Sequence, residues 1–164
     1  MVILPSGGMK IVLFTEKIAQ LLNCNQSEIY FTSGGSESNN LALRGILNPD
    51  KHLITSSYEH PAILEVAKFL ETKGVDVTYL NPNANGIISI DNIKKNIKKN
   101  TTMISIMLTN NELGTINSFD EISHICKINQ ILFHSDAVQY VGKQSIDLSN
   151  EAIDLMSIGA HKFY

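Results

Sequence analysis

The strongest constraint on the fold is a nearly continuous apolar run at residues 103–108, with threonines on both sides. A run of this length without polar alternation is typical of a strand that is covered on both faces of its sheet. Such strands occur in parallel sheets, whose connections are crossover helices. We therefore expect an α/β fold with a mostly parallel sheet and flanking helices.

The rest of the chain alternates in the same way, and no linker or low-complexity stretch interrupts the pattern. Runs of strand length are followed by segments whose apolar residues recur at the helical period. The pattern predicts strands over residues 28–32, 52–56, 75–80, 103–108, 131–134 and 153–158. It predicts a helix that closes at residue 22 and further helices over residues 36–47, 61–72, 91–99 and 118–129.

Local signals indicate where several of these helices begin. Pro61 suits a first helical turn, because its missing N–H has no partner there in any case. Asp91 can cap the helix that follows it. Ser118 with Glu121 forms the sequence pattern of a capping box.

The composition excludes several classes of partner. The 164 residues are 43% hydrophobic and 18% charged, as expected of one globular domain, and the net charge is −3. Nucleic acids and anionic membranes need clustered positive charge, so neither is an expected partner. The cluster of Lys94, Lys95, Lys98 and Lys99 has the spacing of a solvated helix face.

The two cysteines indicate a reducing compartment. Cys24 and Cys126 are too few for a disulfide framework or a zinc site, and we expect no metal. Cys126 lies near Ile125 and Ile128, which favours a buried thiol. The apolar run at residues 11–14 is short and lacks a basic leader, so we expect no signal peptide or membrane span and a cytoplasmic protein.

Polar residues gather where the predicted strands end. The clusters occupy residues 32–36, 58–60, 109–112, 135–139 and 159–162. The carboxyl ends of parallel strands lie at one edge of a sheet, and this edge is where such folds bind ligands. The sequence therefore predicts a single site that is built from several loops.

Lys162 and Asp136 are the candidates for the central chemistry of this site. Lys162 follows His161 after an apolar run, and a lysine in such a place can form a Schiff base with an aldehyde cofactor. Asp136 follows apolar residues 131–133, so we expect its carboxylate at the edge of the core, where it needs a cationic partner. A protonated ring nitrogen would be such a partner. The alternative role of Asp136 is to cap the segment that follows it.

Three further side chains could contact the same ring. Gln139 and Asn111 could reach a phenolic oxygen from neighbouring strand ends. His60 is held extended by Pro61 and could stack on the ring, although a lone histidine more often has a structural role. The other histidines, His52, His124 and His134, lack this setting, and we expect them to be structural or surface residues.

The segment 34–40 is a candidate phosphate site. It follows a strand and opens a helix, so its free backbone N–H groups could bind an anion at the positive helix end. An ordinary strand-to-helix turn is the alternative. The segment lacks the lysine of a P-loop and the glycine spacing of a dinucleotide fingerprint.

Together, these motifs resemble the cysteine desulfurases, which belong to the class V aminotransferase group of pyridoxal-phosphate (PLP) enzymes. The resemblance runs from about Thr15 to the last residue. The matching segments are FTSGGSESNN at 31–40, EH at 59–60, NNELG at 110–114, DAVQ at 136–139, VGK at 141–143 and HK at 161–162.

The resemblance implies a role for each candidate residue. Lys162 would hold PLP as a Schiff base, His60 would stack on the ring and Asp136 would pair with the ring nitrogen. Asn111 and Gln139 would contact the side of the ring that carries the oxygen, and Gly35, Ser36 and His161 would line the phosphate. The implied fold is the large cofactor-binding domain of fold-type I PLP enzymes.

The implied activity converts L-cysteine to L-alanine and passes the sulfur to an enzyme cysteine as a persulfide, for iron–sulfur cluster or thio-cofactor assembly. A homodimer and a sulfur-acceptor or scaffold protein are the implied partners. A selenocysteine lyase, an aminotransferase-like relative and a non-catalytic interaction module are the alternatives.

The sequence departs from the family pattern in three places. Gly159 stands where the family has a phosphate-contacting serine, which predicts a loss of about 1 kcal/mol in phosphate binding. Residues 1–14 diverge, so we expect residues 15–164 to form a partial PLP-binding large domain. The C-terminal small domain, with the persulfide cysteine and a substrate-binding arginine, is expected to be absent. On this expectation the chain alone would be inactive, and Cys24 and Cys126 would not replace the missing cysteine.

Overall fold

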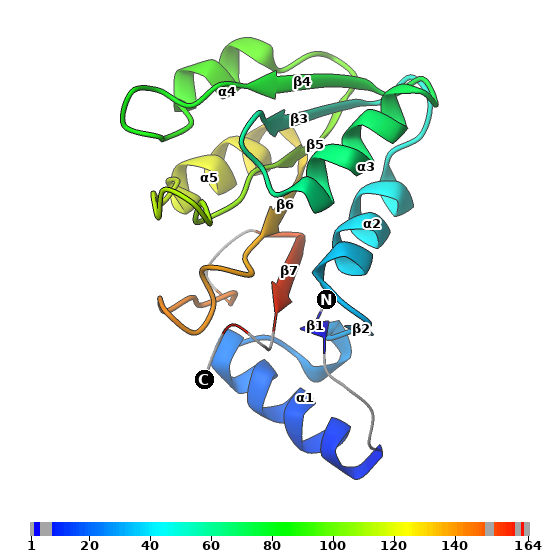
Figure 1. The fold of residues 1–164 in the computed structure, drawn as a ribbon, viewed down its shortest axis with the longest axis vertical. Coiled ribbons are helices and arrows are strands. Elements are labelled where there is room, and N and C mark those ends of the chain that lie inside the picture. The colour runs from blue at the N-terminus through cyan, green and yellow to red at the C-terminus, as the bar shows by residue number, and fades with distance from the viewer. Residues whose placement is uncertain (1, 4–7, 150–152, 160–161, 163–164) are drawn as a thin grey trace.

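The computed structural model describes residues 2–3, 8–149, 153–159 and 162 of the chain (Figure 1). Its centre is a 7-stranded sheet in the order β2-β1-β7-β6-β5-β3-β4, and every pair of neighbouring strands is parallel. This arrangement confirms the predicted α/β fold with a mostly parallel sheet and flanking helices.

Strands and short helical segments alternate along the chain. The strands are β1 (Val2–Ile3), β2 (Phe31–Thr32), β3 (His52–Ser56), β4 (Asp76–Leu80), β5 (Thr101–Ser105), β6 (Leu132–Asp136) and β7 (Leu155–Gly159). The helices are α1 (Gly8–Leu22), the 3₁₀ turn η1 (Gln26–Glu28), α2 (Gly35–Ile46), α3 (Pro61–Glu71), α4 (Ile90–Asn96) and α5 (Phe119–Asn129). Within the described ranges, no helix is long and apolar enough to span a membrane.

The two faces of the sheet are covered by different helices. Successive side chains of a strand point to opposite faces. In β3, Leu53 joins a core with α2 and α3, whereas Ile54 joins a core with α4 and α5. In β5, Met103 and Ile104 divide in the same way. Both faces of these strands are covered, which explains why residues 103–105 are all buried and do not alternate between buried and exposed.

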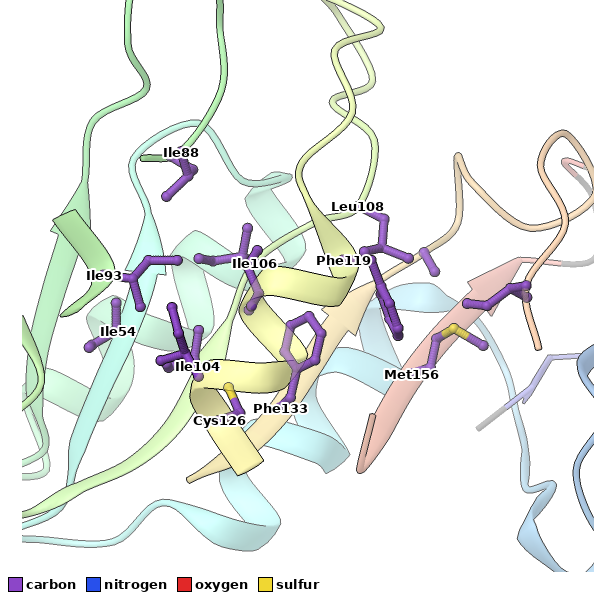
Figure 2. Close-up of a cluster of buried hydrophobic side chains, with 14 of the residues drawn as sticks. Ile54, Ile88, Ile93, Ile104, Ile106, Leu108, Phe119, Cys126, Phe133 and Met156 are labelled. Carbon is purple, nitrogen blue, oxygen red and sulfur yellow. The ribbon is translucent and has the colours of Figure 1, made fainter. Parts of the chain in front are cut away.

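The larger core lies between the sheet and α5 (Figure 2). Phe133 of β6 is fully buried, and its ring centroid lies 5.5 Å from that of Phe119 at the start of α5. Ile104 and Ile106 pack in the same cluster. Because β6 is held on both faces, its last residue, Asp136, has a fixed position at the edge of the sheet.

Two predicted strands differ from the structure by three residues at one end. Residues 26–28 form η1, so the strand predicted over 28–32 is only Phe31–Thr32. The Glu28 carboxylate accepts the Asn25 N–H at 2.6 Å, and this local bond favours the 3₁₀ turn. The apolar run at 103–108 leaves the strand after Ser105, although residues 106–108 stay buried.

The predicted helix ends also need correction. The helix expected over 91–99 spans Ile90–Asn96, and Ser89 rather than Asp91 occupies its N-cap position. Ser118 is the N-cap residue of α5, but its side chain makes no capping hydrogen bond, so the predicted capping box is wrong. The lysine cluster is exposed as expected, and Lys98 pairs with Asp76 at 2.5 Å.

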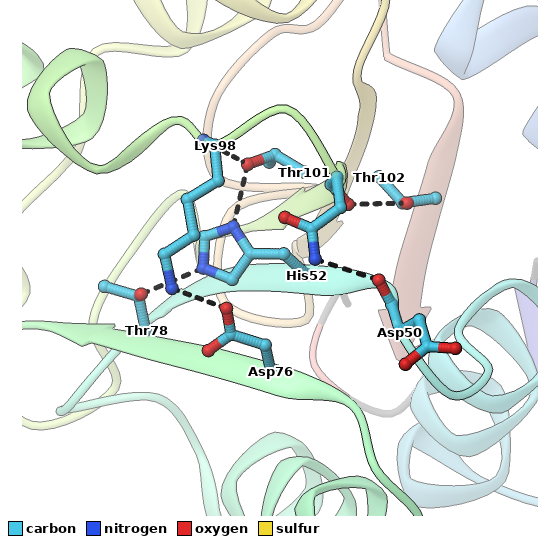
Figure 3. A network of polar contacts seen from close by, with 8 residues as sticks. Asp50, His52, Asp76, Thr78, Lys98, Thr101 and Thr102 are labelled. Atoms are coloured by element: carbon cyan, nitrogen blue, oxygen red, sulfur yellow. Dashed lines mark hydrogen bonds and ion pairs between the residues drawn. The ribbon is translucent and has the colours of Figure 1, made fainter.

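His52 is structural, as predicted (Figure 3). Its side chain is fully buried, with Nδ1 2.7 Å from the Thr101 hydroxyl and Nε2 2.9 Å from the Thr78 hydroxyl. Burial lowers the pKa of His52, with a smaller contribution from the Lys98 charge. His52 thus joins β3 to its two neighbouring strands.

His134 is structural in the same sense. It is fully buried in β6, with Nδ1 2.8 Å from the Ser105 hydroxyl and Nε2 3.4 Å from the Ser157 hydroxyl. Ser157 in turn lies 2.7 Å from the Ser38 hydroxyl of α2. This chain of polar groups crosses three adjacent strands and reaches one helix.

The burial of His134 predicts acid sensitivity. Burial lowers the pKa of His134 from 6.5 to about 3, so the unfolded chain binds a proton that the folded chain does not. The contribution of His134 to stability is present above pH 6.5 and is lost as the pH falls toward 3, by roughly 1.4 kcal/mol per pH unit. Denaturant unfolding of His134→Asn should show a shallower acid slope than that of the control, His124→Asn. Equal slopes in both variants would contradict this assignment.

Candidate functional site

The ends of the central strands meet at one edge of the sheet, as the sequence predicts. Strands β3, β5, β6 and β7 are parallel neighbours, so the loops that leave them share this edge. Hydrogen bonds join the loops to one another. Asn110 donates to the Tyr58 carbonyl at 3.1 Å, which links the loop after β5 to the loop after β3.

Asp136 is the predicted acidic group of the site. It ends β6 and is only 6% exposed. Its Oδ1 accepts the Val138 N–H at 3.1 Å, and its Oδ2 accepts the Asn39 side-chain amide at 2.8 Å. Both of the roles considered for Asp136 are thus compatible with the structure, because one oxygen caps the next turn while the other faces a buried amide.

Asp136 has no cationic partner among the residues that the structure describes. The ion pairs of these residues are Lys68–Glu65 and Lys98–Asp76, and both lie on the exposed surface. A buried carboxylate without a positive neighbour is costly unless a ligand supplies the charge. This donor set fits a ligand with a protonated ring nitrogen.

Asn39 is a residue of the site that the sequence reasoning does not single out. It lies fully buried in α2 and donates to Asp136, while its Oδ1 has no hydrogen-bond partner among the described residues. The available signal is its position between Ser38 and Leu43, on the face of α2 that packs inward. An amide at a core position usually needs a polar partner.

His60 begins α3 and is exposed. Its ψ angle of 145° is extended, as Pro61 requires, and its Nδ1 accepts the Ala62 N–H at 3.1 Å. That bond places the proton of a neutral imidazole on Nε2. The ring is therefore fixed at one end and exposed to solvent, which would allow it to lie against a planar ligand.

Asn111 and Gln139 line the same small cavity. Its volume is about 300 Å³, and Thr109 and Lys143 also line it. Lys143 Nζ donates to Gln139 Oε1 at 2.8 Å. The structure thus brings together two of the predicted amide side chains from loops that follow β5 and β6.

The predicted phosphate segment is the first turn of α2. Gly34 is the N-cap residue, Ser36 is exposed, and the space where a Gly34 side chain would lie is open to 4 Å. A Cβ atom at position 35 would lie 3.5 Å from Val138 Cγ2, which places this turn against the loop that follows Asp136. Glu37 folds back to accept the Ser33 N–H at 2.5 Å. Hydrogen bonding to the Ser33 side chain and, to a smaller extent, to this N–H lowers the pKa of Glu37. The N–H groups of the first turn lack intrahelical partners in any α-helix, so they are suited to an anion.

Lys162 follows β7 and is exposed. His161 lies outside the described residues, so its predicted place at the phosphate stays a prediction. Because β7 pairs with β6 and Ser157 pairs with Asp136, the polypeptide that carries Lys162 leaves the sheet beside Asp136.

Neither cysteine is suited to nucleophilic chemistry. Burial, with the nearby Asp154 charge, raises the pKa of the Cys126 thiol to about 12. Cys126 is 2% exposed, which confirms the predicted buried thiol. Burial and the charge of Glu28 raise the pKa of Cys24. Among the described residues, no group of three or more potential ligands is placed to hold a metal ion.

A second cavity lies elsewhere. It has a volume of about 890 Å³ and lies between the end of α1, α2 and residues 148–149 and 153–158. Cys24, Leu41 and Met156 are among its lining residues, and none of the predicted site residues lines it. The predicted site residues and this cavity are therefore separate features.

Comparisons with known proteins identify the chain's relatives. Residues 10–164 match the family described as aminotransferase class-V. The chain is 51% identical over 152 residues to the cysteine desulfurase IscS of Buchnera aphidicola subsp. Acyrthosiphon pisum (strain 5A), covering 90% of this chain and 38% of that protein. It is 47% identical over 156 residues to the cysteine desulfurase IscS of Clostridium botulinum (strain Kyoto / Type A2), covering 93% of this chain and 39% of that protein.

Solved structures agree with this result. The chain is similar to SspA in complex with cysteine, with a TM-score of 0.88 and 41% identity, covering 94% of this chain and 47% of that one. It is also similar to a NifS-like protein, with a TM-score of 0.87 and 34% identity, covering 97% of this chain and 47% of that one. The chain thus spans 38–39% of the length of the two curated relatives and less than half of these structures.

Proposed function

The chain belongs to the aminotransferase class-V family, and on this basis we propose that it is the PLP-binding portion of a cysteine desulfurase. The observation that carries the proposal is the Asp136 carboxylate, which is 6% exposed, held by two hydrogen bonds and without a cationic partner among the described residues. PLP, when bound, supplies an electron sink for bonds to the substrate Cα.

In this proposal, each side chain has a role that follows from its position. Asp136 keeps the ring nitrogen protonated, and Asn39 holds the Asp136 carboxylate in place through the bond at 2.8 Å. His60, fixed through Nδ1, lies against the ring face. Lys162 binds the cofactor covalently and moves protons to and from the substrate.

The remaining groups orient the cofactor. Asn111 and Gln139 contact the ring oxygen from the cavity that they share. The first turn of α2, at Gly35 and Ser36, binds the phosphate together with His161. These contacts would fix the ring at its edges and leave its substrate side to Lys162.

The proposed reaction breaks the carbon–sulfur bond of L-cysteine. The carbon fragment takes up a proton and leaves as L-alanine, while the sulfur passes to an enzyme cysteine as a persulfide. Neither Cys24 nor Cys126 suits this role, because burial raises the pKa of both thiols. We also propose a homodimer and a sulfur-acceptor or scaffold protein as partners, from the family resemblance.

The proposal is tested by adding PLP to the purified protein and following the absorption band of the bound cofactor. L-Cysteine, L-selenocysteine and an ordinary amino acid such as L-alanine are then compared as ligands that change this band. We expect the strongest response to L-cysteine. A stronger response to L-selenocysteine would favour a selenocysteine lyase, and a folded protein that binds no PLP would favour an interaction module.

A substitution at Gly159 is expected to have a smaller effect on PLP affinity. Gly159 ends β7 where the family has a serine, so Gly159→Ser should add one hydroxyl donor to the phosphate. One neutral hydrogen bond contributes about 1 kcal/mol, so we expect PLP to bind roughly 5-fold more tightly. PLP titration measures the change, and Gly45→Ser in α2, where a side chain has open space, is the matched control. Equal affinities of Gly159→Ser and the control would contradict this role for position 159.

A further inference from the structure

Glu59 is a buried acid to which the proposed function gives no role. It directly precedes His60 and is 3% exposed. Its Oε1 accepts the Ser56 hydroxyl at 2.6 Å and the Met107 N–H at 2.9 Å. Its Oε2 is buried and has no hydrogen-bond partner among the described residues.

The two bonds of Glu59 Oε1 join the segments that carry two proposed cofactor contacts. Ser56 ends β3, and the loop after it carries His60. Met107 follows the end of β5, and the segment after it carries Asn111. The Asn110 amide reinforces the same junction through its bond to the Tyr58 carbonyl at 3.1 Å. Glu59 therefore lies where the two segments diverge toward the edge of the sheet.

The charge state of Glu59 also matters to this edge. Burial raises the pKa of Glu59 to about 8, and the nearby Asp136 charge adds to the rise. Asp136 and Tyr58 are the titratable groups among the described residues whose charges couple to that of Glu59. Ser56 and Met107, which contact Oε1, are uncharged. Near neutral pH Glu59 therefore carries a proton and adds no negative charge beside Asp136.

We propose that Glu59 is a positioning residue, which ties the His60 loop to the Asn111 segment through the two hydrogen bonds of its Oε1. The part of this inference that concerns the cofactor rests on the proposed function. The tie between the loops is a property of the chain itself. The two parts can therefore be tested separately.

The first experiment uses the protein without cofactor. Glu59→Gln is neutral and keeps an oxygen for Ser56 and Met107, whereas Glu59→Ala removes the acceptor. We expect hydrogen exchange at the Met107 and Ala62 amides to stay as in the wild type in Glu59→Gln and to accelerate at least 10-fold in Glu59→Ala. Glu65→Gln, on the exposed surface of α3, is the matched control. Unchanged exchange in Glu59→Ala would overturn the tie.

The pH dependence gives a second readout that does not depend on the cofactor. Because the folded pKa of Glu59 is raised from 4.5 to about 8, the folded chain holds a proton that the unfolded chain loses in this range. The stabilisation from this proton is complete below pH 4.5 and is lost as the pH rises through 8. Relative to wild type, Glu59→Gln should therefore gain stability from pH 4.5 to 8, with a slope of about one proton. If the difference in stability between Glu59→Gln and wild type does not vary with pH, Glu59 is not protonated in the folded chain. This test uses only Glu59→Gln, so it still applies if Glu59→Ala does not fold.

The third experiment addresses the cofactor. We expect Glu59→Gln to bind PLP within about 3-fold of wild type at neutral pH and to keep that affinity above pH 8, where the wild type loses affinity as Glu59 ionises. Glu59→Ala should bind at least 10-fold more weakly than Glu59→Gln. Equal PLP affinities and equal pH profiles for wild type and both variants would overturn the positioning role. If no variant and no wild-type protein binds PLP, the proposed function fails, while the exchange and stability results still decide the tie.

Discussion

Lys162→Ala is expected to abolish the covalent attachment of PLP to the protein. The ε-amino group of lysine is the nucleophile that joins the cofactor aldehyde, and alanine offers no nitrogen in its place. Wild-type protein that is incubated with PLP and reduced with borohydride should carry a stable mass increase on the peptide that contains Lys162. The same treatment of Lys162→Ala should leave no stoichiometric label.

Lys95→Ala is the matched control for this experiment. Lys95 is an exposed lysine in the last turn of α4, outside the loops that carry the predicted site residues. Its replacement should leave the label on the Lys162 peptide intact. A label that persists in Lys162→Ala, or that maps to a surface lysine in the wild type, would contradict the role of Lys162.

Asp136→Ala is expected to produce the second large effect. The substitution removes the carboxylate that is proposed to pair with a protonated ring nitrogen, and it leaves the buried Asn39 amide without its acceptor at 2.8 Å. A hydrogen bond to a charged group contributes about 2 to 3 kcal/mol, so PLP affinity should fall roughly 30- to 150-fold. Spectrophotometric PLP titration measures this change, and the absorption band of any bound cofactor should shift.

The Asp136→Asn variant separates the effect of the negative charge on PLP binding from the effect of side-chain size. It keeps the size of the side chain but has no negative charge to stabilise a protonated nitrogen, so it should also weaken PLP binding. Thermal unfolding of the cofactor-free variants shows whether the fold is intact. If folded Asp136→Ala binds PLP with wild-type affinity and an unchanged band, Asp136 does not pair with the ring.

The central strands could be predicted from the sequence, because a strand that is buried on both faces has a continuous run of apolar residues. Ile54 and Ile104 face one core while Leu53 and Met103 face the other, so their strands read as continuous apolar runs. The prediction from apolar runs fails where local hydrogen bonds decide the secondary structure. Glu28 reads as part of a strand, yet its bond to the Asn25 N–H favours a 3₁₀ turn.

Burial alone also misplaces the end of a strand. Residues 106–108 are as buried as the strand before them, but β5 ends at Ser105. From there the backbone bonds to other segments, because Met107 donates its N–H to Glu59 and its carbonyl accepts the Asn117 amide. Side chains that are distant in sequence supply these partners, so periodicity cannot reveal them.

The residues of the site also fall into two groups, those that the sequence predicts and those that only the structure shows. The positions of Asp136, His60, Asn111 and Gln139 at one edge follow from strand order. Asp136 ends β6, and the other three lie in the segments that follow β3, β5 and β6. The supporting residue Asn39 and the tie through Glu59 depend on contacts across the fold, with bonds to Asp136 and Met107 respectively. No spacing in the sequence indicates such pairs. Only the three-dimensional arrangement shows which polar groups are buried together.

The most direct test of this account is an experimental structure of the protein with PLP bound. We expect the Asp136 carboxylate to contact the ring nitrogen while Lys162 Nζ is bonded to the carbon at the opposite side of the ring and His60 covers one face. The account is wrong if PLP lies away from the strand-end edge, or if Asp136 and Lys162 do not contact the same cofactor molecule.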